Sequence, residues 1–447
     1  MIDSFVPDPQ QGSERSAGSN MAASPRVPLR TRIIDWVQFV RTLAVNLIVI
    51  ISIAAIVVLL TRELLREPVI IEEVSLPPSM VAQGFSGAVT AQRLWDAISD
   101  IQIKSTTHKT QTALLAANRQ LDVAAPGTGI SLQQLTQALR SMLNLPQTRI
   151  AGEVLCATPD CTFSELRLRL RVFKDGRMHV LRSDPVGARS LDGYFHLSAI
   201  RVLEVIDPYV LAAYLYYYEI RRDDAVEIAE DLLRRQHTQS AWAANLIGNR
   251  HLDEGRPAAA LPHYELALDL AEEFGPDTFA VPHKNIGLAL IELGDPAGAI
   301  ARLSDAIEID NANFETWRGL GQALLAKGEP RLAAERLRTA VELAPDDLLS
   351  WTALGDALSA AERYHEAFRK YHFAIDLNPI DTKPRLAWRK SLAEYIARGP
   401  DRCSRVGQPV AEYLRVAGSG VPQVFRAELL ALRKACGLAV PFGLEDS

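Results

Sequence analysis

Two stretches of the chain share one pattern at a fixed spacing. Residues 317–345 read WRGLGQALLAKGEPRLAAERLRTAVELAP, and residues 351–379, which begin 34 residues later, read WTALGDALSAAERYHEAFRKYHFAIDLNP. A tryptophan, a leucine–glycine pair, two alanines and a proline recur at matching places, and only the Gly328 position, which becomes Glu362, changes type. Such a period predicts stacked helical units, each too small to bury its apolar face alone.

Weaker copies of the pattern precede these two. One contains Ile286-Gly287, an earlier one contains Ile247-Gly248, and a degenerate unit surrounds Tyr214. The repeat region is therefore expected to cover residues 206–380. Helical spacing of apolar residues over 386–396 and 424–432 predicts capping helices within the remaining segment, residues 381–447, because an open solenoid end exposes apolar surface.

The pattern resembles that of the tetratricopeptide-repeat (TPR) family, which has a 34-residue period, an early Trp, a Leu-Gly pair, later alanines and a terminal Pro. The resemblance implies an α-solenoid in which the first helix of each unit lines a groove for a protein or peptide partner. The alternative for each groove residue is that it belongs to the ordinary solvated surface and has no binding role. The register gives these candidate groove residues: Asn245, Asn249, Lys284, Arg318, Gln322, Thr352 and Asp356.

A charge-free apolar run lies near the start of the chain. Residues 43–60 read LAVNLIVIISIAAIVVLL, and no polar face recurs at helical spacing. Eighteen helical residues extend about 27 Å, close to the hydrocarbon thickness of a bilayer. The run therefore predicts a single transmembrane helix, with a buried soluble helix as the alternative. Residues 1–42 would form an N-terminal tail, disordered in its Ser-, Pro- and Gly-rich first part.

The distribution of arginines favours one membrane orientation. Arg26, Arg30, Arg32 and Arg41 precede the run, whereas Arg62 and Arg66 follow it. Because cytoplasmic flanks carry more Lys and Arg, the N-terminus is expected in the cytoplasm. The protein would then be a single-pass protein of the inner (cell) membrane, with most of the chain periplasmic or otherwise extracytoplasmic.

Residues 68–205 are expected to form a small α/β domain. Apolar spacing over 89–103 predicts a helix, and residues 162–172 alternate between apolar side chains and arginines, as in a half-buried strand. Asp175-Gly176 is a hairpin turn signal. The arginines Arg167, Arg169 and Arg171 form either an anion- or lipid-headgroup-binding face or a solvated face that discourages edge pairing.

The four cysteines fall into two local pairs. Cys156 and Cys161 bracket a turn-forming Ala-Thr-Pro-Asp, and Cys403 and Cys436 lie in the C-terminal segment. These are the candidate disulfides, and four free thiols are the alternative. Paired cysteines would fit an oxidising compartment.

Composition and motifs give no support for catalysis or nucleic-acid binding. The formal net charge of −6 does not favour a nucleic-acid partner. The sequence has no G-x-S-x-G, P-loop or H-E-x-x-H motif, and no histidine pair completes a zinc site with the cysteines. No enzymatic activity, cofactor or metal is therefore expected.

The fold class is thus mainly α: a transmembrane helix, a small α/β domain and a TPR α-solenoid with C-terminal capping helices. The leading hypothesis is a membrane-anchored scaffold or adaptor, and a homo-oligomer is an alternative to a foreign protein partner. The other two hypotheses place the specific role in residues 68–205, either as an envelope ligand sensor or as a small undetected enzyme domain.

Overall fold

The computed structural model falls into two compact units. The first unit contains residues 1–67 and 121–146, and the second contains 68–120 and 147–447. The described residues are 29–65, 68–82, 84–105, 114–116, 138–140, 142, 143, 145, 147–156, 158, 165–183, 188, 190–274 and 279–398.

The first unit contains one long helix. Helix α1 (Leu29–Leu65) includes the predicted apolar span of residues 43–60. Its described side chains from Gln38 to Ile51 are all exposed. Among the residues that the structure describes, no helix combines the length and the apolar character needed to cross a bilayer. The structure therefore does not confirm the predicted transmembrane helix.

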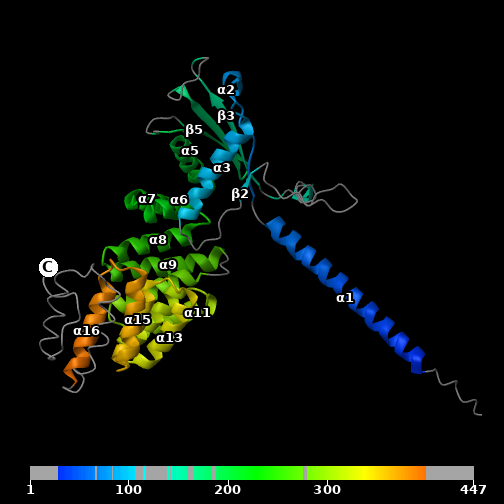
Figure 1. The fold of residues 1–447 in the computed structure, drawn as a ribbon. Coiled ribbons are helices and arrows are strands. Elements are labelled where there is room, and N and C mark those ends of the chain that lie inside the picture. The colour runs from blue at the N-terminus through cyan, green and yellow to red at the C-terminus, as the bar shows by residue number, and fades with distance from the viewer. Residues whose placement is uncertain are drawn as a thin grey trace, which may run out of the picture. The chain divides into compact units, whose positions relative to one another are not determined.

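The second unit begins with a five-stranded sheet in the order β2-β1-β3-β4-β5 (Figure 1). β1 pairs in parallel with β2 and β3, and β3, β4 and β5 are antiparallel neighbours. Asp175 and Gly176, both at positive φ, form the β4–β5 turn, as the sequence predicts. The strands are β1 (Val69–Ile71), β2 (Leu114–Ala116), β3 (Thr148–Leu155), β4 (Arg167–Lys174) and β5 (Arg177–Ser183).

Two helices cover one face of this sheet. α3 (Gly87–Lys104) and α5 (Leu191–Ile206) contact each other, and α5 packs on β4 and β5; the short α2 (Pro78–Ala82) precedes them. The buried hydroxyl of Tyr194 on α5 accepts a hydrogen bond from the Leu168 amide at 2.7 Å and donates one to the Ser183 carbonyl at 2.6 Å. This side chain therefore fixes α5 against both strands, and the alternating side chains of β4 bury only their apolar half.

Five antiparallel helix pairs follow within the described range 208–377, as the repeat period predicts. The second helices of the last two pairs end two residues before Pro345 and Pro379, because proline cannot continue a helix. The pairs are α6 (Pro208–Tyr217) with α7 (Arg222–Arg234), α8 (Ser240–Asp253) with α9 (Pro257–Phe274), α10 (Ala280–Glu292) with α11 (Pro296–Ile309), α12 (Phe314–Ala326) with α13 (Pro330–Leu343), and α14 (Leu348–Ala360) with α15 (Tyr364–Leu377).

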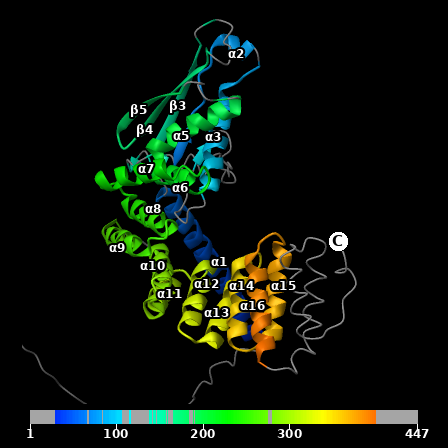
Figure 2. The ribbon, with the colours of Figure 1, turned by 90° about the vertical axis from the view of Figure 1, so that its left-hand side faces the viewer.

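The pairs stack in chain order into a solenoid (Figure 2). Successive first helices contact one another, from α8 through α10 and α12 to α14, whereas contacts between successive second helices are at most sparse in the described chain. The first helices are therefore closer together and lie on the inner side of the curve.

A glycine sets the helix spacing in four of these pairs. A Cβ atom added at the glycine would lie closer than 3.0 Å to a large side chain of the second helix. Only glycine therefore allows the two helices to approach this closely. The glycine–side chain contacts are Gly248–Tyr264, Gly287–Leu303, Gly321–Leu337 and Gly355–Tyr371.

Both ends of the solenoid are covered. α16 (Lys383–Ala397) packs on α14 and α15 and buries Trp388 and Leu392 completely, as expected of a capping helix over 386–396. The second expected helix, over 424–432, lies outside the described residues. At the other end, α3 and α5 contact α6, and one hydrophobic core runs from the sheet to α8. The expected boundary between residues 205 and 206 therefore falls at the end of α5 but not at a break in packing.

We expect the substitution Gly321→Ala to lower the free energy of unfolding by about 1–3 kcal/mol, because its methyl group would overlap the fully buried Leu337. Urea denaturation of the full chain measures the change. Gly193→Ala is the control, since its Cβ would meet only the Ser190 hydroxyl at 3.4 Å, and alanine favours a helix by up to about 1 kcal/mol. Equal losses in both variants would contradict this account of the glycines.

Candidate protein-binding surface

The candidate groove residues all lie on the first helices of their pairs. We call the side of the solenoid formed by α8, α10, α12 and α14 the inner face. Asn245, Lys284 and Thr352 are at most 8% exposed, so they are less accessible than a binding residue should be. Asn249, Arg318 and Asp356 are half-buried, and Gln322 is exposed. The structure therefore brings the predicted set onto one face but opens only part of it to a partner.

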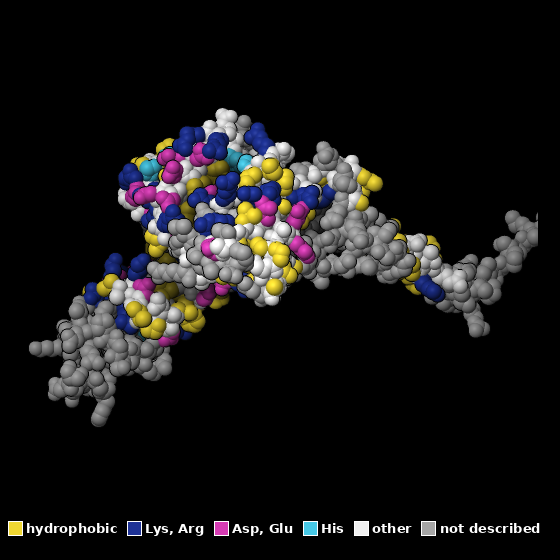
Figure 3. Space-filling view, turned by 90° about the horizontal axis from the view of Figure 1, so that it is seen from above, with side chains coloured by type: hydrophobic (Ala, Val, Ile, Leu, Met, Phe, Trp, Pro, Cys, Tyr) yellow, Lys and Arg dark blue, Asp and Glu magenta, His cyan; other side chains and the backbone are white. Residues whose placement is uncertain are grey.

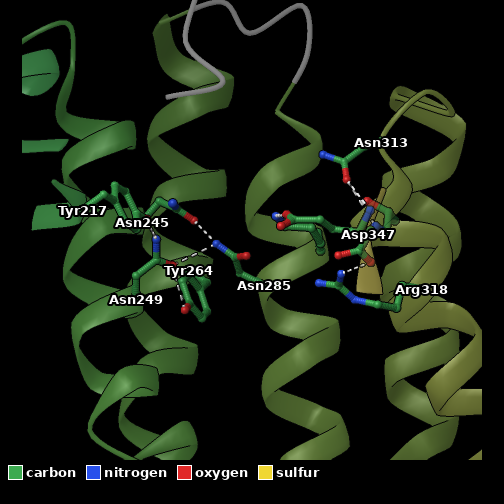
Figure 4. A network of polar contacts seen from close by, with 11 residues as sticks. Tyr217, Asn245, Asn249, Tyr264, Asn285, Asn313, Arg318 and Asp347 are labelled. Carbon is green, nitrogen blue, oxygen red and sulfur yellow. Dashed lines mark hydrogen bonds and ion pairs between the residues drawn. The ribbon is translucent and has the colours of Figure 1, made fainter. Parts of the chain in front are cut away.

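An amide network joins three of the pairs (Figure 4). The Nδ2 atom of Asn285 donates to Oδ1 of Asn245 at 2.9 Å and to Oδ1 of Asn249 at 3.0 Å. Asn249 also donates from Nδ2 to the Tyr217 hydroxyl at 2.7 Å and accepts from the Tyr264 hydroxyl at 3.0 Å. These side chains are occupied with one another, so their first role is to lock the register of successive repeats.

Two ion pairs continue this bridging toward the C-terminus. Lys284 on α10 pairs with Glu315 on α12, and the Arg318 guanidinium on α12 lies 2.6 Å from Oδ2 of Asp347, just before α14. The side chains of Arg318 and Asp347 are each 17% exposed. Because such charges are costly to bury unpaired, loss of either partner would destabilise the junction between two repeats, and each pair neutralises the inner face locally.

Asp347 also caps α14. Its Oδ2 atom accepts from the Ser350 amide at 2.8 Å, which satisfies a free donor at the start of the helix. Burial alone would raise the pKa of Asp347, but hydrogen bonds from Ser350 and the charge of Arg318 outweigh it and lower that pKa below its ordinary value of 3.8. The charged form of Asp347 therefore stabilises the folded chain.

The pKa of Asp356 is shifted in the opposite direction, above its ordinary value. Burial raises its pKa, although the Tyr371 hydroxyl donates to Oδ1 at 2.8 Å and Lys390 lies nearby. The charge of Glu394 adds to the increase. Asp356 is thus a carboxylate whose charge is incompletely compensated within the fold, and a basic group of a partner would compensate it.

Each glycine that sets the helix spacing contacts a side chain of the second helix. That side chain decides whether the residue after the glycine receives a hydrogen bond. Where the second helix supplies tyrosine, its hydroxyl passes the glycine and bonds the next residue, Asn249 or Asp356. Where the second helix supplies Leu337, no hydroxyl reaches Gln322. Within the described chain Gln322 is exposed and has no side-chain hydrogen bond, so its amide is open to a partner.

Sequence reasoning missed several residues that complete this surface. Tyr217 is the last residue of α6 in the degenerate first pair, and Asp347 is the N-cap of α14, so neither falls on a groove position of the repeat register. Tyr264 occupies a second-helix position that the register assigns to packing. A tyrosine at the second-helix position that contacts the glycine of the first helix is the sequence signal for such a hydroxyl.

The remaining candidate residues are the cysteines. Cys156 is disulfide-bonded, and Cys161, Cys403 and Cys436 lie outside the described residues. The pairings Cys156–Cys161 and Cys403–Cys436 therefore stay predictions. Among the described residues, no group of three or more His, Cys, Asp or Glu side chains is arranged to hold a metal ion.

Comparisons with known proteins identify the repeats. Residues 290–357 match the model of the tetratricopeptide-repeat family. No curated protein matches the chain. Among solved structures, the chain is similar to residues 41 to the end of MamA from Desulfovibrio magneticus RS-1, with 20% identity, 44% of this chain and 96% of that chain covered, and a TM-score of 0.32.

Two further solved structures give similar values. YrrB has 21% identity, 43% of this chain and 96% of its own chain covered, and a TM-score of 0.32. A thermophilic TPR protein from Thermus thermophilus has 21% identity, 42% and 98% coverage, and a TM-score of 0.35. Both are described as TPR proteins. The match of residues 290–357 to the family model confirms the interpretation of the repeat pattern as TPR.

We expect Asp347→Asn and Asp356→Asn to change stability with opposite pH dependence. The Asp347 carboxylate contributes stability above the unfolded pKa near 3.8 and loses it as pH falls, so Asp347→Asn should cost about 1–3 kcal/mol near pH 7 and less below pH 4. The stability contributed by Asp356 falls as pH rises from 3.8 through its raised pKa, so the cost of Asp356→Asn should shrink over that rise. Urea denaturation at several pH values tests both, and slopes of the same sign would contradict the assignment.

Proposed function

We propose that this protein is a membrane-anchored TPR scaffold that binds a protein partner through the inner face. The observation that carries the proposal is that the inner face has two parts. In one part the polar side chains are hydrogen-bonded to one another, and in the other, which we call the open part, they remain accessible. The amide network occupies the N-terminal pairs, whereas Gln322 and the half-buried Asp356 remain accessible farther along. Partner contacts would therefore concentrate on α12 and α14.

The open part has a mixed chemistry suited to a peptide. Leu349 lies three residues before Thr352, hence on the same side of α14, and is 39% exposed. Gln322 offers an amide, and Asp356 offers a carboxylate whose charge is incompletely compensated. A peptide with an apolar side chain and a basic group would be complementary to these three residues, and no catalytic step is required of them.

Anchoring by α1 is the second element of the proposal. Residues 43–60 carry no charge, and Leu47, Ile48 and Ile50 on α1 are each at least 57% exposed. Apolar side chains on every side of a helix suit contact with lipid. The arginine distribution supports an N-terminus in the cytoplasm. The disulfide at Cys156 supports an oxidising, extracytoplasmic environment for the rest of the chain.

A cavity favours a ligand sensor as the second candidate function. About 700 Å³ of space lies between the β4–β5 hairpin and α7, with Arg177 and His179 on one side and Asp231 and Arg235 on the other. It joins the sheet to the first helix pair of the solenoid, so a ligand bound there would contact both. Ligand-dependent thermal stabilisation of the full chain, abolished by Arg177→Ala, would support this function over a passive spacer.

Photo-crosslinking in native membranes tests the scaffold. We expect p-benzoylphenylalanine in place of Gln322 to form an adduct with one specific foreign protein, because this side chain faces the open part of the inner face. The matched control is the same replacement of Glu335, which is exposed on the second helix of the same pair. Equal adducts at both positions would contradict the binding surface, and adducts with a second copy alone would indicate homo-oligomerisation.

A reporter fused to the C-terminus tests the topology. We expect a periplasmic alkaline phosphatase fusion to be active and a fluorescent protein that folds only in the cytoplasm to be dark, because α1 would export everything after it. The protein should also stay in the membrane pellet after alkaline extraction. Extraction into the soluble fraction would contradict the anchor, and a bright cytoplasmic reporter would contradict the orientation.

A further inference from the structure

Within the part of the chain that the structure describes, the helices that pack on the sheet, α3 and α5, cover only one of its faces. The side chains that alternate with the buried residues of β3, β4 and β5 point away from α3 and α5, and we call them the outer sheet face. Basic, acidic and hydrophobic side chains are intermixed on the side of the molecule seen from above (Figure 3). The outer sheet face consists of Arg149, Ala151, Glu153, Leu155, Arg167, Arg169, Arg171, Phe173, Met178, Val180 and Arg182.

Positive charge is in excess on this face. Arg169 and Arg171 lie 3.0 and 2.7 Å from the same atom, Oε1 of Glu153, so one carboxylate serves two guanidiniums. Arg149 pairs with Glu72, which follows β1. Among the described residues, these two glutamates oppose four arginines, namely Arg182 and the three that pair with them. The outer sheet face is therefore complementary to a surface with many negative charges.

Apolar side chains stand beside these arginines. Phe173 and Met178 are cross-strand neighbours, 40% and 56% exposed, and Val180, opposite Arg171, is 47% exposed. A sheet face that meets only water normally carries polar residues at such positions. Arginines around exposed aromatic and aliphatic side chains are a combination that suits the interface of an anionic bilayer, where the cations meet headgroups and the apolar side chains reach the acyl boundary.

The chain order favours the bilayer as the occupant. Only residues 66–68 separate the end of α1 at Leu65 from the start of β1 at Val69. If α1 is embedded as proposed above, the sheet is tethered at the membrane surface, where the effective concentration of headgroups is high. A soluble acidic protein would have no comparable advantage.

We propose that the outer sheet face binds anionic phospholipid headgroups of the bilayer that holds α1. The arginines contact the phosphates, and Phe173, Met178 and Val180 lie at the boundary between headgroups and acyl chains. The inference rests on the membrane anchoring proposed above. It gives the sheet a role of its own, which is to hold the base of the solenoid against the membrane.

Lipid photo-crosslinking of the full chain tests this binding. The chain carries p-benzoylphenylalanine at Phe173, or at Ile103 as a control, and is reconstituted in nanodiscs of phosphatidylcholine alone or mixed equally with phosphatidylglycerol. Ile103 is an exposed apolar residue on α3, which packs on the opposite side of the sheet. We expect severalfold more lipid adduct at Phe173 than at Ile103 in the anionic discs, and a severalfold decrease in neutral discs or in high salt.

Variants that remove arginines test whether lipid binding depends on the positive charge of the outer sheet face. Arg167→Gln with Arg182→Gln should reduce the Phe173 adduct severalfold, while circular dichroism and thermal unfolding check that the fold persists. Retention of the chain by neutral discs reports the insertion of α1, so loss of retention would contradict the anchor independently. With α1 inserted, equal adducts at Phe173 and Ile103, or adducts insensitive to lipid charge, would overturn the lipid-binding face. Crosslinks from Phe173 to a second copy would assign it to self-association instead.

Discussion

The close approach of the two helices in each repeat depends on a missing side chain. At Gly248, Gly287, Gly321 and Gly355 any Cβ would overlap a large residue of the second helix, so these glycines fix the geometry of the stack, and the last three recur every 34 residues. The same contact organises the inner face. Where the second-helix residue is tyrosine, its hydroxyl emerges beside the glycine and bonds Asn249 or Asp356, and where it is Leu337, the neighbouring Gln322 stays open. The packing of the helices and the pattern of hydrogen bonds on the inner face therefore share one cause.

The polar residues of the inner face fall into two classes with different physical roles. Asn245, Asn249 and Asn285 satisfy one another across repeats, and the Arg318–Asp347 pair does the same farther along. Buried polar groups must be satisfied in this way, because an unpaired one costs about 1–3 kcal/mol. The second class is a smaller set whose hydrogen bonds or charge the fold leaves incomplete, namely Gln322 and Asp356.

The sheet and the first helices of the solenoid share one hydrophobic core, so the sheet is not packed as an independent domain. Its covering helices α3 and α5 contact α6, so the apolar end of the repeat stack is buried at that side, as α16 buries the other. One face of the sheet meets this core, and the opposite face carries the arginines and exposed apolar residues. The division follows from the strand period of two, which sends alternate residues of β4 to opposite sides.

The sequence by itself determined the helix pairs, their capping helix α16, the hairpin at Asp175-Gly176 and the face on which the candidate groove residues lie, because each depends on local spacing. The tertiary structure alone decided which of those residues are accessible. Burial of Asn245, Lys284 and Thr352 depends on side chains from neighbouring repeats, as the bond from Asn285 to Asn245 shows. Contacts between residues about one repeat apart have no signature in a local pattern. For the same reason the continuous core between the sheet and α8 was visible only in the fold.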